Sequence, residues 1–384
     1  MILAGDHRQH ASVEAGDALR LLEEKSGLRV ARVKKVVRQR RNVHYKQAIT
    51  ALSAGDTKGG FKKLEKMGCV VEIEDAAKRE QRIAEDYLRS VTARRSAIVV
   101  APTHAEGKRI ARAIRTRLKT ARHLDVHERT FTNQRDLSLT EAEKLDATVY
   151  REGMTIQFHQ NVCGGFRAGE KYEVTGRQQG KITLRHSGSD QLFTLDPKHG
   201  KNYSVYQKGT INLSKGETIR ISANGRTREK NRISNGQIYQ VVGFTKDGHL
   251  RLSNGKTLDK DYRNFQYGYT RTSHSVQGRD AQDVLIAQSA ISFPASNDKQ
   301  FYVSTSRGVE TCRVYTDDKE ALRQAVQRSG DRLSAQELRR EQQEQIKQRT
   351  RFYTRQIKNK FRDEPKNARQ PKKQLSPTKD ARIR

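Results

Sequence analysis

The sequence has no tryptophan, three cysteines and no long apolar run. Crossing a bilayer takes a run of about 18 apolar residues, and no apolar stretch after the N-terminus resembles a signal peptide. Cys69, Cys163 and Cys312 are odd in number, lie far apart and show no CxxC spacing, which argues against a disulfide framework or a zinc site. We therefore expect a soluble, cytoplasmic protein with no membrane insertion and no metal site.

Acidic residues are scarce relative to basic ones. Lys and Arg number 76 against 44 Asp and Glu, which gives a net charge of +32 over 384 residues. This excess favours a polyanion as partner, because each neutralised phosphate releases condensed counterions. Nucleic acid is the leading candidate, since a membrane-surface helix would normally carry Trp or Phe on its apolar face. The length exceeds what one hydrophobic core organises and predicts two or three folding units.

The first 140 residues alternate apolar runs with amphipathic stretches, which is typical of α/β units. Ile98–Ala101 predicts a buried parallel strand, and the apolar spacing from 110 to 118 predicts a helix after it. Thr103 and Glu106 stand three apart and predict a capping box at its start. Such a helix N-terminus can bind phosphate, but an ordinary cap with no ligand is equally consistent with this segment.

Residues 153–266 have a β texture with Asn-Gly turns, and this region repeats. Gly153–Ile156 returns as Gly216–Ile219, and Gly169–Gly176 returns as Gly236–Gly243. Residues 180–184 return as 248–252. Two tandem small β-barrels, or one barrel built twice, are the natural interpretation. Such modules guide nucleic-acid strands in some proteins and are inert spacers in others, so direct contact with nucleic acid stays open.

After Phe265 the α/β texture resumes, with apolar runs at Val284–Ile286 and Phe301–Val303. A further strand over Cys312–Tyr315 is expected to precede a helix from Asp317. Residues 331–384 then hold 17 Lys and Arg against 7 Asp and Glu, a net charge of +10. The composition predicts a basic helix that leads into a disordered tail.

Four short motifs stand in a fixed order along the chain. Gly5-Asp6-His7-Arg8-Gln9 directly follows a predicted strand over Ile2–Ala4, and Arg38-Gln39 follows two valines. Thr272-Ser273-His274-Ser275-Val276-Gln277-Gly278 precedes the predicted strand at Val284. Tyr302-Val303-Ser304-Thr305-Ser306-Arg307 places an arginine just past another predicted strand. The arginine side chain can bind phosphate oxygens in a bidentate manner. The four motifs in this order are far more specific than any one of them alone.

The order GDxxQ, RQ, TxHxxQG and YVxxSR resembles motifs III to VI of superfamily 1 helicases of the RecD-like branch. The β modules ahead of TxHxxQG resemble the helicase portion of conjugative relaxase-helicases of the TraI/TrwC (MobF) type. The resemblance implies an α/β fold, with a RecA-like parallel sheet domain interrupted by small β-barrel inserts and a basic helical to disordered tail. It implies five parts: a remnant of a first RecA-like domain (1–30), the first part of a second (31–150), tandem β-barrel inserts (151–266), the remainder of the second (267–330) and the tail (331–384).

The resemblance also implies roles for individual residues. Gln9, Arg38 and Arg307 match the groups that sense the γ-phosphate and stabilise its charge during ATP hydrolysis. The residues that match nucleotide-binding positions are Asp6, which would also order its loop, Gln277, Gly278 and Asp280. Thr103, Thr272 and His274 would face single-stranded DNA. For Thr103, Thr272, His274 and each serine, a capped helix or a satisfied turn is the alternative.

The resemblance implies ATP and Mg²⁺ as cofactors, but the phosphate-binding loop and the acidic pair that bind them are absent from this sequence. Gly255-Lys256-Thr257 lacks the glycine five residues upstream that a phosphate-binding loop needs and lies in a predicted hairpin. The acids after Val70-Val71 follow GDxxQ instead of preceding it. We therefore expect the C-terminal part of an ATP-dependent 5′ to 3′ DNA helicase in plasmid transfer, acting with an upstream helicase or relaxase polypeptide or the conjugation machinery. The alternatives are a non-enzymatic single-stranded DNA-binding module and a truncated fragment that folds poorly.

Overall fold

The computed structural model describes residues 2–10, 17–33, 36–137 and 139–332, and scattered residues between 334 and 354. It divides into two units. The larger unit comprises residues 1–10 and 29–330, and the smaller comprises residues 11–28 and 331–384.

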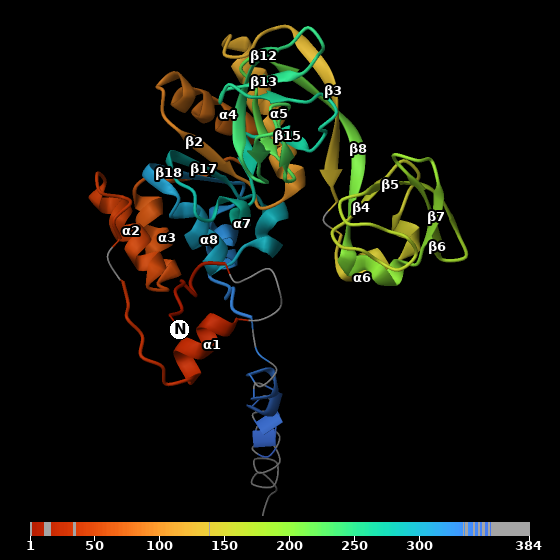
Figure 1. Cartoon of the computed structure of the whole chain (residues 1–384). Coiled ribbons are helices and arrows are strands. Elements are labelled where there is room, and N and C mark those ends of the chain that lie inside the picture. The colour runs from red at the N-terminus through yellow and green to blue at the C-terminus, as the bar shows by residue number, and fades with distance from the viewer. Residues whose placement is uncertain are drawn as a thin grey trace, which may run out of the picture. The chain divides into compact units, whose positions relative to one another are not determined.

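A five-stranded parallel sheet forms the centre of the larger unit, in the order β1-β18-β17-β2-β16 (Figure 1). Its strands are β1 (Val70–Glu72), β2 (Ala97–Val100), β16 (Thr270–Arg271), β17 (Ala281–Ala287) and β18 (Gly308–Thr316). Strand β17 is buried almost throughout, as expected of a strand with a parallel neighbour on each side. The strands predicted at Ile98–Ala101, Val284–Ile286 and Cys312–Tyr315 are confirmed.

Helices cover both faces of this sheet. On one face lie α2 (Val43–Ser53), α3 (Thr57–Lys66), α7 (Ser273–Val276), α8 (Asp298–Thr305) and α9 (Lys319–Ala325), which enclose one apolar core. On the other face α4 (Ala76–Thr92) and α5 (His104–Thr120) enclose a second core. The predicted fold class, a RecA-like α/β domain with a parallel sheet, is confirmed, and an interrupting β region separates β2 from β16.

The segment Phe301–Val303 is helical, so the strand predicted there is wrong. It lies within α8, which begins where the side chain of Asn297 accepts a hydrogen bond from the backbone N–H of Gln300 at 2.8 Å. The Ser304 hydroxyl donates to the carbonyl of Gln300, four residues earlier. Phe301 and Val303 are fully buried against the sheet. The N-cap and this burial outweigh the β propensity of the Phe-Tyr-Val run.

Ile2–Ala4 forms no strand, so the strand predicted there is wrong. Ile2 is 95 % exposed and Leu3 is 51 % exposed. An apolar run of this kind becomes a central strand only when neighbouring strands satisfy its backbone on both sides. In the described part of the chain this segment has none.

The start of α5 is predicted correctly, but only half of the capping box forms. The Thr103 hydroxyl accepts a hydrogen bond from the backbone N–H of Glu106 at 3.3 Å. The Glu106 carboxylate does not return to the cap; it accepts instead from the hydroxyl of Ser289 at 2.8 Å. Ser289 follows β17, so tertiary contact decides the orientation of the Glu106 side chain.

The interrupting region contains two antiparallel sheets whose strands repeat. The first holds β4 (Thr155–Phe158), β5 (Lys171–Gln178), β6 (Lys181–His186) and β7 (Leu192–Leu195). The second holds β9 (Thr218–Ile221), β12 (Ile238–Phe244), β13 (Leu250–Leu252) and β14 (Thr257–Leu258). In each sheet these strands pair in chain order. The hairpin predicted around Gly255-Lys256-Thr257 is confirmed as the β13–β14 turn.

Register confirms the internal repeat residue by residue. Thr155 pairs with Glu173 in the first sheet, and their counterparts Thr218 and Gln240 pair in the second. A register shift follows Val174 in β5, and the same shift follows its counterpart Val241 in β12. Each sheet encloses its own apolar core. Among the described residues no strand pair closes either sheet into a barrel.

A long two-stranded ribbon runs between the two modules (Figure 1). It consists of β3 (Glu128–Asp136) and β8 (Tyr203–Ser214). The first residues of β8 pair with β4 of the first module, whereas Ile211 and Leu213 belong to the core of the second. The larger unit also contains α6 (Glu141–Leu145), β10 (Gly225–Arg226), β11 (Arg232–Ile233) and β15 (Phe265–Tyr267), the last paired with β9.

A buried ion pair joins the second module to the parallel-sheet domain. Arg115 of α5 contacts Glu217, which precedes β9, with a shortest N–O distance of 2.9 Å. The Glu217 carboxylate is fully buried and also accepts from the hydroxyl of Tyr269 at 2.5 Å. The Arg115 guanidinium lies over the Tyr267 ring at 4.7 Å. Every oxygen and charge in this joint therefore has a partner.

The smaller unit contains α1 (Ala18–Lys25) and the described part of the C-terminal segment. Two guanidinium nitrogens of Arg20 donate to the Glu337 carboxylate, each at 3.0 Å, and a third contact joins Arg20 to Asp17. Residues 337–340 and 342–344 are helical, which agrees with a helix at the start of the tail. The predicted disorder falls on residues 355–384, outside the described residues.

No helix in the described ranges combines the length and the apolar character needed to span a membrane.

The buried ion pair between α5 and the second module predicts a large effect on stability. Replacing Arg115 with alanine leaves the Glu217 carboxylate buried without its cation, so we expect a loss of about 3–5 kcal/mol in the free energy of unfolding. Urea denaturation measures this loss. The matched control is Arg112→Ala on the exposed side of the same helix, with an expected change within about 0.5 kcal/mol. Equal effects of the two substitutions would contradict the importance of this joint.

Candidate functional site

The RQ and YVxxSR motifs are bonded to each other at the turn from α8 into β18. Nη1 of Arg38 donates to the carbonyl of Ser306 at 2.7 Å. Nε2 of Gln39, a fully buried side chain, donates to the carbonyls of Ser306 and Gly308 at 3.2 and 2.5 Å. A Cβ at position 308 would lie 2.4 Å from the hydroxyl of Tyr45, so only glycine fits at the start of β18. The turn that carries Arg307 is therefore tightly held.

Two arginines lie at the edge of the parallel sheet formed by the amino-terminal ends of its strands. Nε of Arg38 lies 2.8 Å from Oδ1 of Asp280, which directly precedes β17. Arg307 directly precedes β18, and Ala281 and Gly308 pair across these two strands. Arg307 is only 3 % exposed, and its guanidinium donates to the carbonyl of Val303 and to the hydroxyl of Ser306.

Burial sets the electrostatics of Arg307. It lowers the pKa of this guanidinium, and the charge of Arg38 lowers it further, whereas Asp280 opposes the shift. A guanidinium nevertheless stays protonated at neutral pH. Two cations and one carboxylate thus share a small region, which leaves a net positive charge suited to phosphate oxygens.

The GDxxQ loop is ordered by its own aspartate. Oδ1 of Asp6 accepts from the backbone N–H of Arg8 at 3.0 Å, and Oδ2 accepts from Nε2 of Gln9 at 2.9 Å. The Arg8 guanidinium packs against Gly55, where an added Cβ would come within 2.8 Å of Nη1. The loop thus adopts a defined conformation although no strand precedes it.

His10, the residue after GDxxQ, connects this loop to the TxHxxQG motif. Its ring stacks on that of His274, with centroids 3.7 Å apart and planes inclined by 13°. Burial lowers the pKa of His10 to about 4, and the charges of His274, Lys299 and Arg307 contribute to the shift. His10 therefore remains a neutral ring at physiological pH and lies in the same cationic region as Arg307.

The structure brings most of the predicted site residues together. Asp6, Gln9, Arg38, His274, Asp280 and Arg307 belong to this cluster, which we call the motif cluster. Gln277 and Gly278 lie in the exposed loop between α7 and β17. Thr272 is the N-cap of α7, and its carbonyl accepts from the Ser275 hydroxyl at 2.9 Å. Thr103 caps α5, as described above.

Sequence reasoning assigned no role to three residues that lie beside the motif cluster. Gln39 is the second residue of the RQ motif, so a motif signal for it existed. His10 directly follows GDxxQ and could have been included with that loop. Lys299 has no signal in the sequence, because its position beside His10 depends on how α8 packs.

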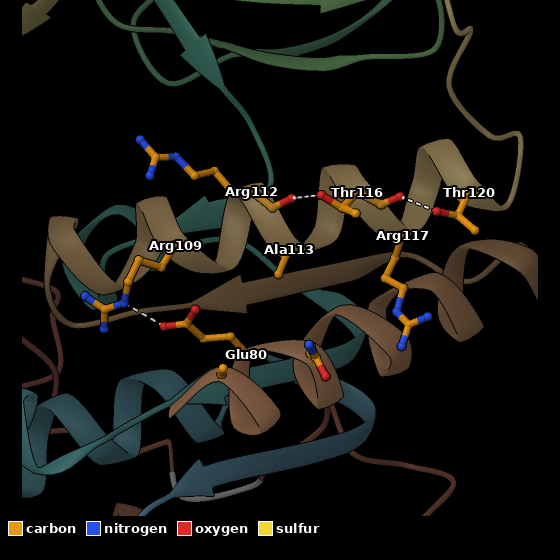
Figure 2. A pocket seen from close by; sticks show the side chains of 9 residues that line it. Glu80, Arg109, Arg112, Ala113, Thr116, Arg117 and Thr120 are labelled. Atoms are coloured by element: carbon orange, nitrogen blue, oxygen red, sulfur yellow. Dashed lines mark hydrogen bonds and ion pairs between the residues drawn. The ribbon is translucent and has the colours of Figure 1, made fainter. Parts of the chain in front are cut away.

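A separate hollow of about 570 Å³ lies between α4 and α5. Figure 2 shows that Arg109 points toward Glu80, and these side chains form an ion pair at 2.6 Å. Arg112 points away from Glu80 (Figure 2). None of the residues predicted to act at the site lines this hollow. The Arg109–Glu80 ion pair partly closes this hollow, and we assign no function to it.

No group of three or more His, Cys, Asp or Glu side chains within the described ranges is placed to hold a metal ion.

Comparison with known proteins gives one family match. A family model described as an AAA domain matches residues 1–75. No curated protein sequence matches the chain. Among solved structures, Pif1 helicase from Bacteroides in complex with ADP-AlF3 and ssDNA has a TM-score of 0.27 and 12 % identity, covering 77 % of this chain and 53 % of that chain. Pif1 helicase from Candida albicans has a TM-score of 0.27 and 10 % identity, covering 75 % and 57 %. The chain spans about half the length of these helicases.

The stacked histidines predict that docking of the GDxxQ loop depends on pH. The pKa of His10 falls from 6.5 to about 4 in the folded protein. Between these values the unfolded or undocked state binds more protons, so the stabilisation is fully present above pH 6.5 and is lost as the pH falls toward 4. NMR titration of the His10 ring measures the pKa, and hydrogen exchange of residues 6–10 measures docking. In a His10→Asn variant this part of the pH dependence should disappear; a His10 pKa near 6.5 would contradict the partial burial of His10 against His274.

Proposed function

We propose that this chain supplies the second RecA-like domain, the β inserts and the basic tail of an ATP-dependent DNA helicase of superfamily 1. The observation that carries the proposal is the convergence of the four motifs. Arg38 of RQ and Ser306 of YVxxSR are 268 residues apart in the chain, yet these motifs form one cluster with GDxxQ and TxHxxQG at one edge of the sheet. Unrelated polar segments would have no reason to converge in this way. The AAA-domain match over residues 1–75 supports the same assignment.

The arginines of the motif cluster fit the phosphates of a nucleotide. Arg38 is half-buried and Arg307 is buried, so their charges are screened less by water than charges on the open surface. In the proposed reaction they stabilise the charge that develops on the γ-phosphoryl group as its bond to ADP breaks. Gln9 senses that phosphate, and Asp6 orders its loop. Gln277, Gly278 and Asp280 bind the rest of the nucleotide, and Asp280 releases Arg38 when a phosphate replaces its carboxylate.

The residues described here do not fit Mg²⁺. The acidic pair and the phosphate-binding loop that the reaction needs would come from a separate RecA-like domain. In the proposed assembly Thr103, Thr272 and His274 face single-stranded DNA, and His274 then links the strand to the GDxxQ loop through its stack on His10. The RecD-like 5′ to 3′ direction and a place in a conjugative relaxase-helicase acting in plasmid transfer rest on the motif resemblance.

ATP hydrolysis tests the role of Arg307. We join the chain to an upstream RecA-like domain that carries GxxxxGK[ST] and an acidic pair, and compare Arg307→Ala with the parent. An arginine that acts on the transferring phosphoryl group contributes roughly 10³–10⁵-fold to kcat, so we expect turnover to fall to background. Binding of single-stranded DNA should persist.

The matched control is Arg251→Ala, which removes an exposed arginine from β13 and should leave turnover unchanged. Unchanged turnover in Arg307→Ala would refute its assigned role. A parent protein that binds single-stranded DNA without any effect of ATP would favour the non-enzymatic binding module instead.

A further inference from the structure

Two arginines from separate elements donate to the carbonyl of Gly236, and the charge of a third, Arg220, interacts with both. Nη2 of Arg279, in the loop before β17, donates to this carbonyl at 2.9 Å. Nη2 of Arg271, the last residue of β16, donates to the same oxygen at 3.4 Å. Arg220, in β9 of the second module, pairs with Gln266 on the neighbouring strand β15, and its guanidinium lies against the Gln266 side-chain amide. We call these three residues the arginine cluster.

No carboxylate within the described ranges forms an ion pair with the arginine cluster, although Arg271 is only 5 % exposed. Burial lowers the pKa of Arg271 to about 10, and the charges that lower it further are those of Arg279 and Arg220. Burial and Arg279 likewise lower the pKa of Arg220. Each shift has the sign expected when like charges are held together away from water.

Two other largely buried arginines, Arg115 and Arg20, have a different environment, whereas Arg307 in the motif cluster also has a lowered pKa. Arg115 is paired with Glu217, and the pKa of its guanidinium is raised. Arg20 is paired with Glu337, again with a raised pKa. Burial of a charge without a counter-ion is unfavourable, so an unpaired set at this place calls for an external anion.

Basic residues of α5 and β3 interact electrostatically with one another and with Arg220 of the arginine cluster. Burial lowers the pKa of His104, at the start of α5, and Arg220 and Arg135 add to this effect, opposed by Asp136. Burial also lowers the pKa of Lys108, one turn along α5, with contributions from Arg135 and Arg112. Lys108 and Arg135 thus add positive charge from α5 and β3, whereas the lowered pKa of His104 favours its neutral form.

We propose that the arginine cluster binds the phosphodiester backbone of single-stranded DNA, so that the second β module contacts the strand directly and is not an inert spacer. This inference rests on the proposed function, in which the chain binds single-stranded DNA. Guanidinium groups match phosphate oxygens in a bidentate manner, and Arg279 is exposed, so the cluster is accessible. Cations from α5, β3, β9 and β16 can contact more than one phosphate of a strand.

Binding of fluorescent oligo-dT to the full chain tests the inference. We compare Arg220→Gln, Arg279→Gln and the double variant with the parent by anisotropy over a range of salt concentrations. Each single substitution should weaken binding roughly 5- to 10-fold at low salt and reduce the slope of log K against log salt by about 0.7, the value for one phosphate contact to a single strand. Arg271 is left intact because it is buried.

The matched control is Arg251→Gln, which removes the same charge from an exposed position on β13 of the same module. It should change affinity less than two-fold and leave the slope unchanged. If Arg220→Gln and Arg279→Gln behave like Arg251→Gln, the inference is wrong while DNA binding by the chain stands. If the parent itself does not bind oligo-dT, the proposed function fails as well. If the two substitutions impair binding of sodium triphosphate but not of oligo-dT, the cluster binds a free polyphosphate and the inference is overturned.

Discussion

The turn from α8 into β18 depends on hydrogen bonds from side chains that lie 267 to 269 residues earlier in the chain. Arg38 and Gln39 satisfy the carbonyls of Ser306 and Gly308, which burial would otherwise leave unpaired at considerable cost. The position of Arg307, the start of β18 and the environment of His10 all follow from this turn. A buried polar contact therefore determines where the motif cluster lies, and the apolar cores on the two faces of the sheet support it.

Arginine is used in two opposed ways in this protein. Where a guanidinium joins elements permanently, as Arg115 does with Glu217, a buried carboxylate neutralises it. Where positive charge is held for an external anion, as at Arg271, other cations are the neighbours. The basic residues that give the net charge of +32 therefore serve at least two different roles. Neighbouring residues can even divide between the two proposed sites, since Arg279 belongs to the arginine cluster and Asp280 contacts Arg38.

The duplicated modules share more than their sequence pattern. Equivalent residues pair in equivalent register, and the irregularity after Val174 recurs after Val241. Their surroundings differ, however. In the first module β4 pairs with the ribbon strand β8, whereas in the second β9 pairs with β15, which leads into β16 of the parallel sheet. This difference brings Arg220 of the second module next to the sheet domain.

The sequence by itself determined the α/β texture, the interrupting β repeat and its turns, the start of α5 and the order of the four motifs. These features are local, because helix period, strand alternation and caps depend on residues within a few positions of one another. Tertiary structure decided that Phe301–Val303 is helical, that Ile2–Ala4 forms no strand and that Glu106 turns to Ser289. It also decided the pairing of Arg38 with Asp280 and the meeting of Arg220, Arg271 and Arg279. Each of these depends on which strands and helices become neighbours. A buried side chain contacts several distant residues at once, and together these contacts can outweigh the helix or strand propensity of the local sequence.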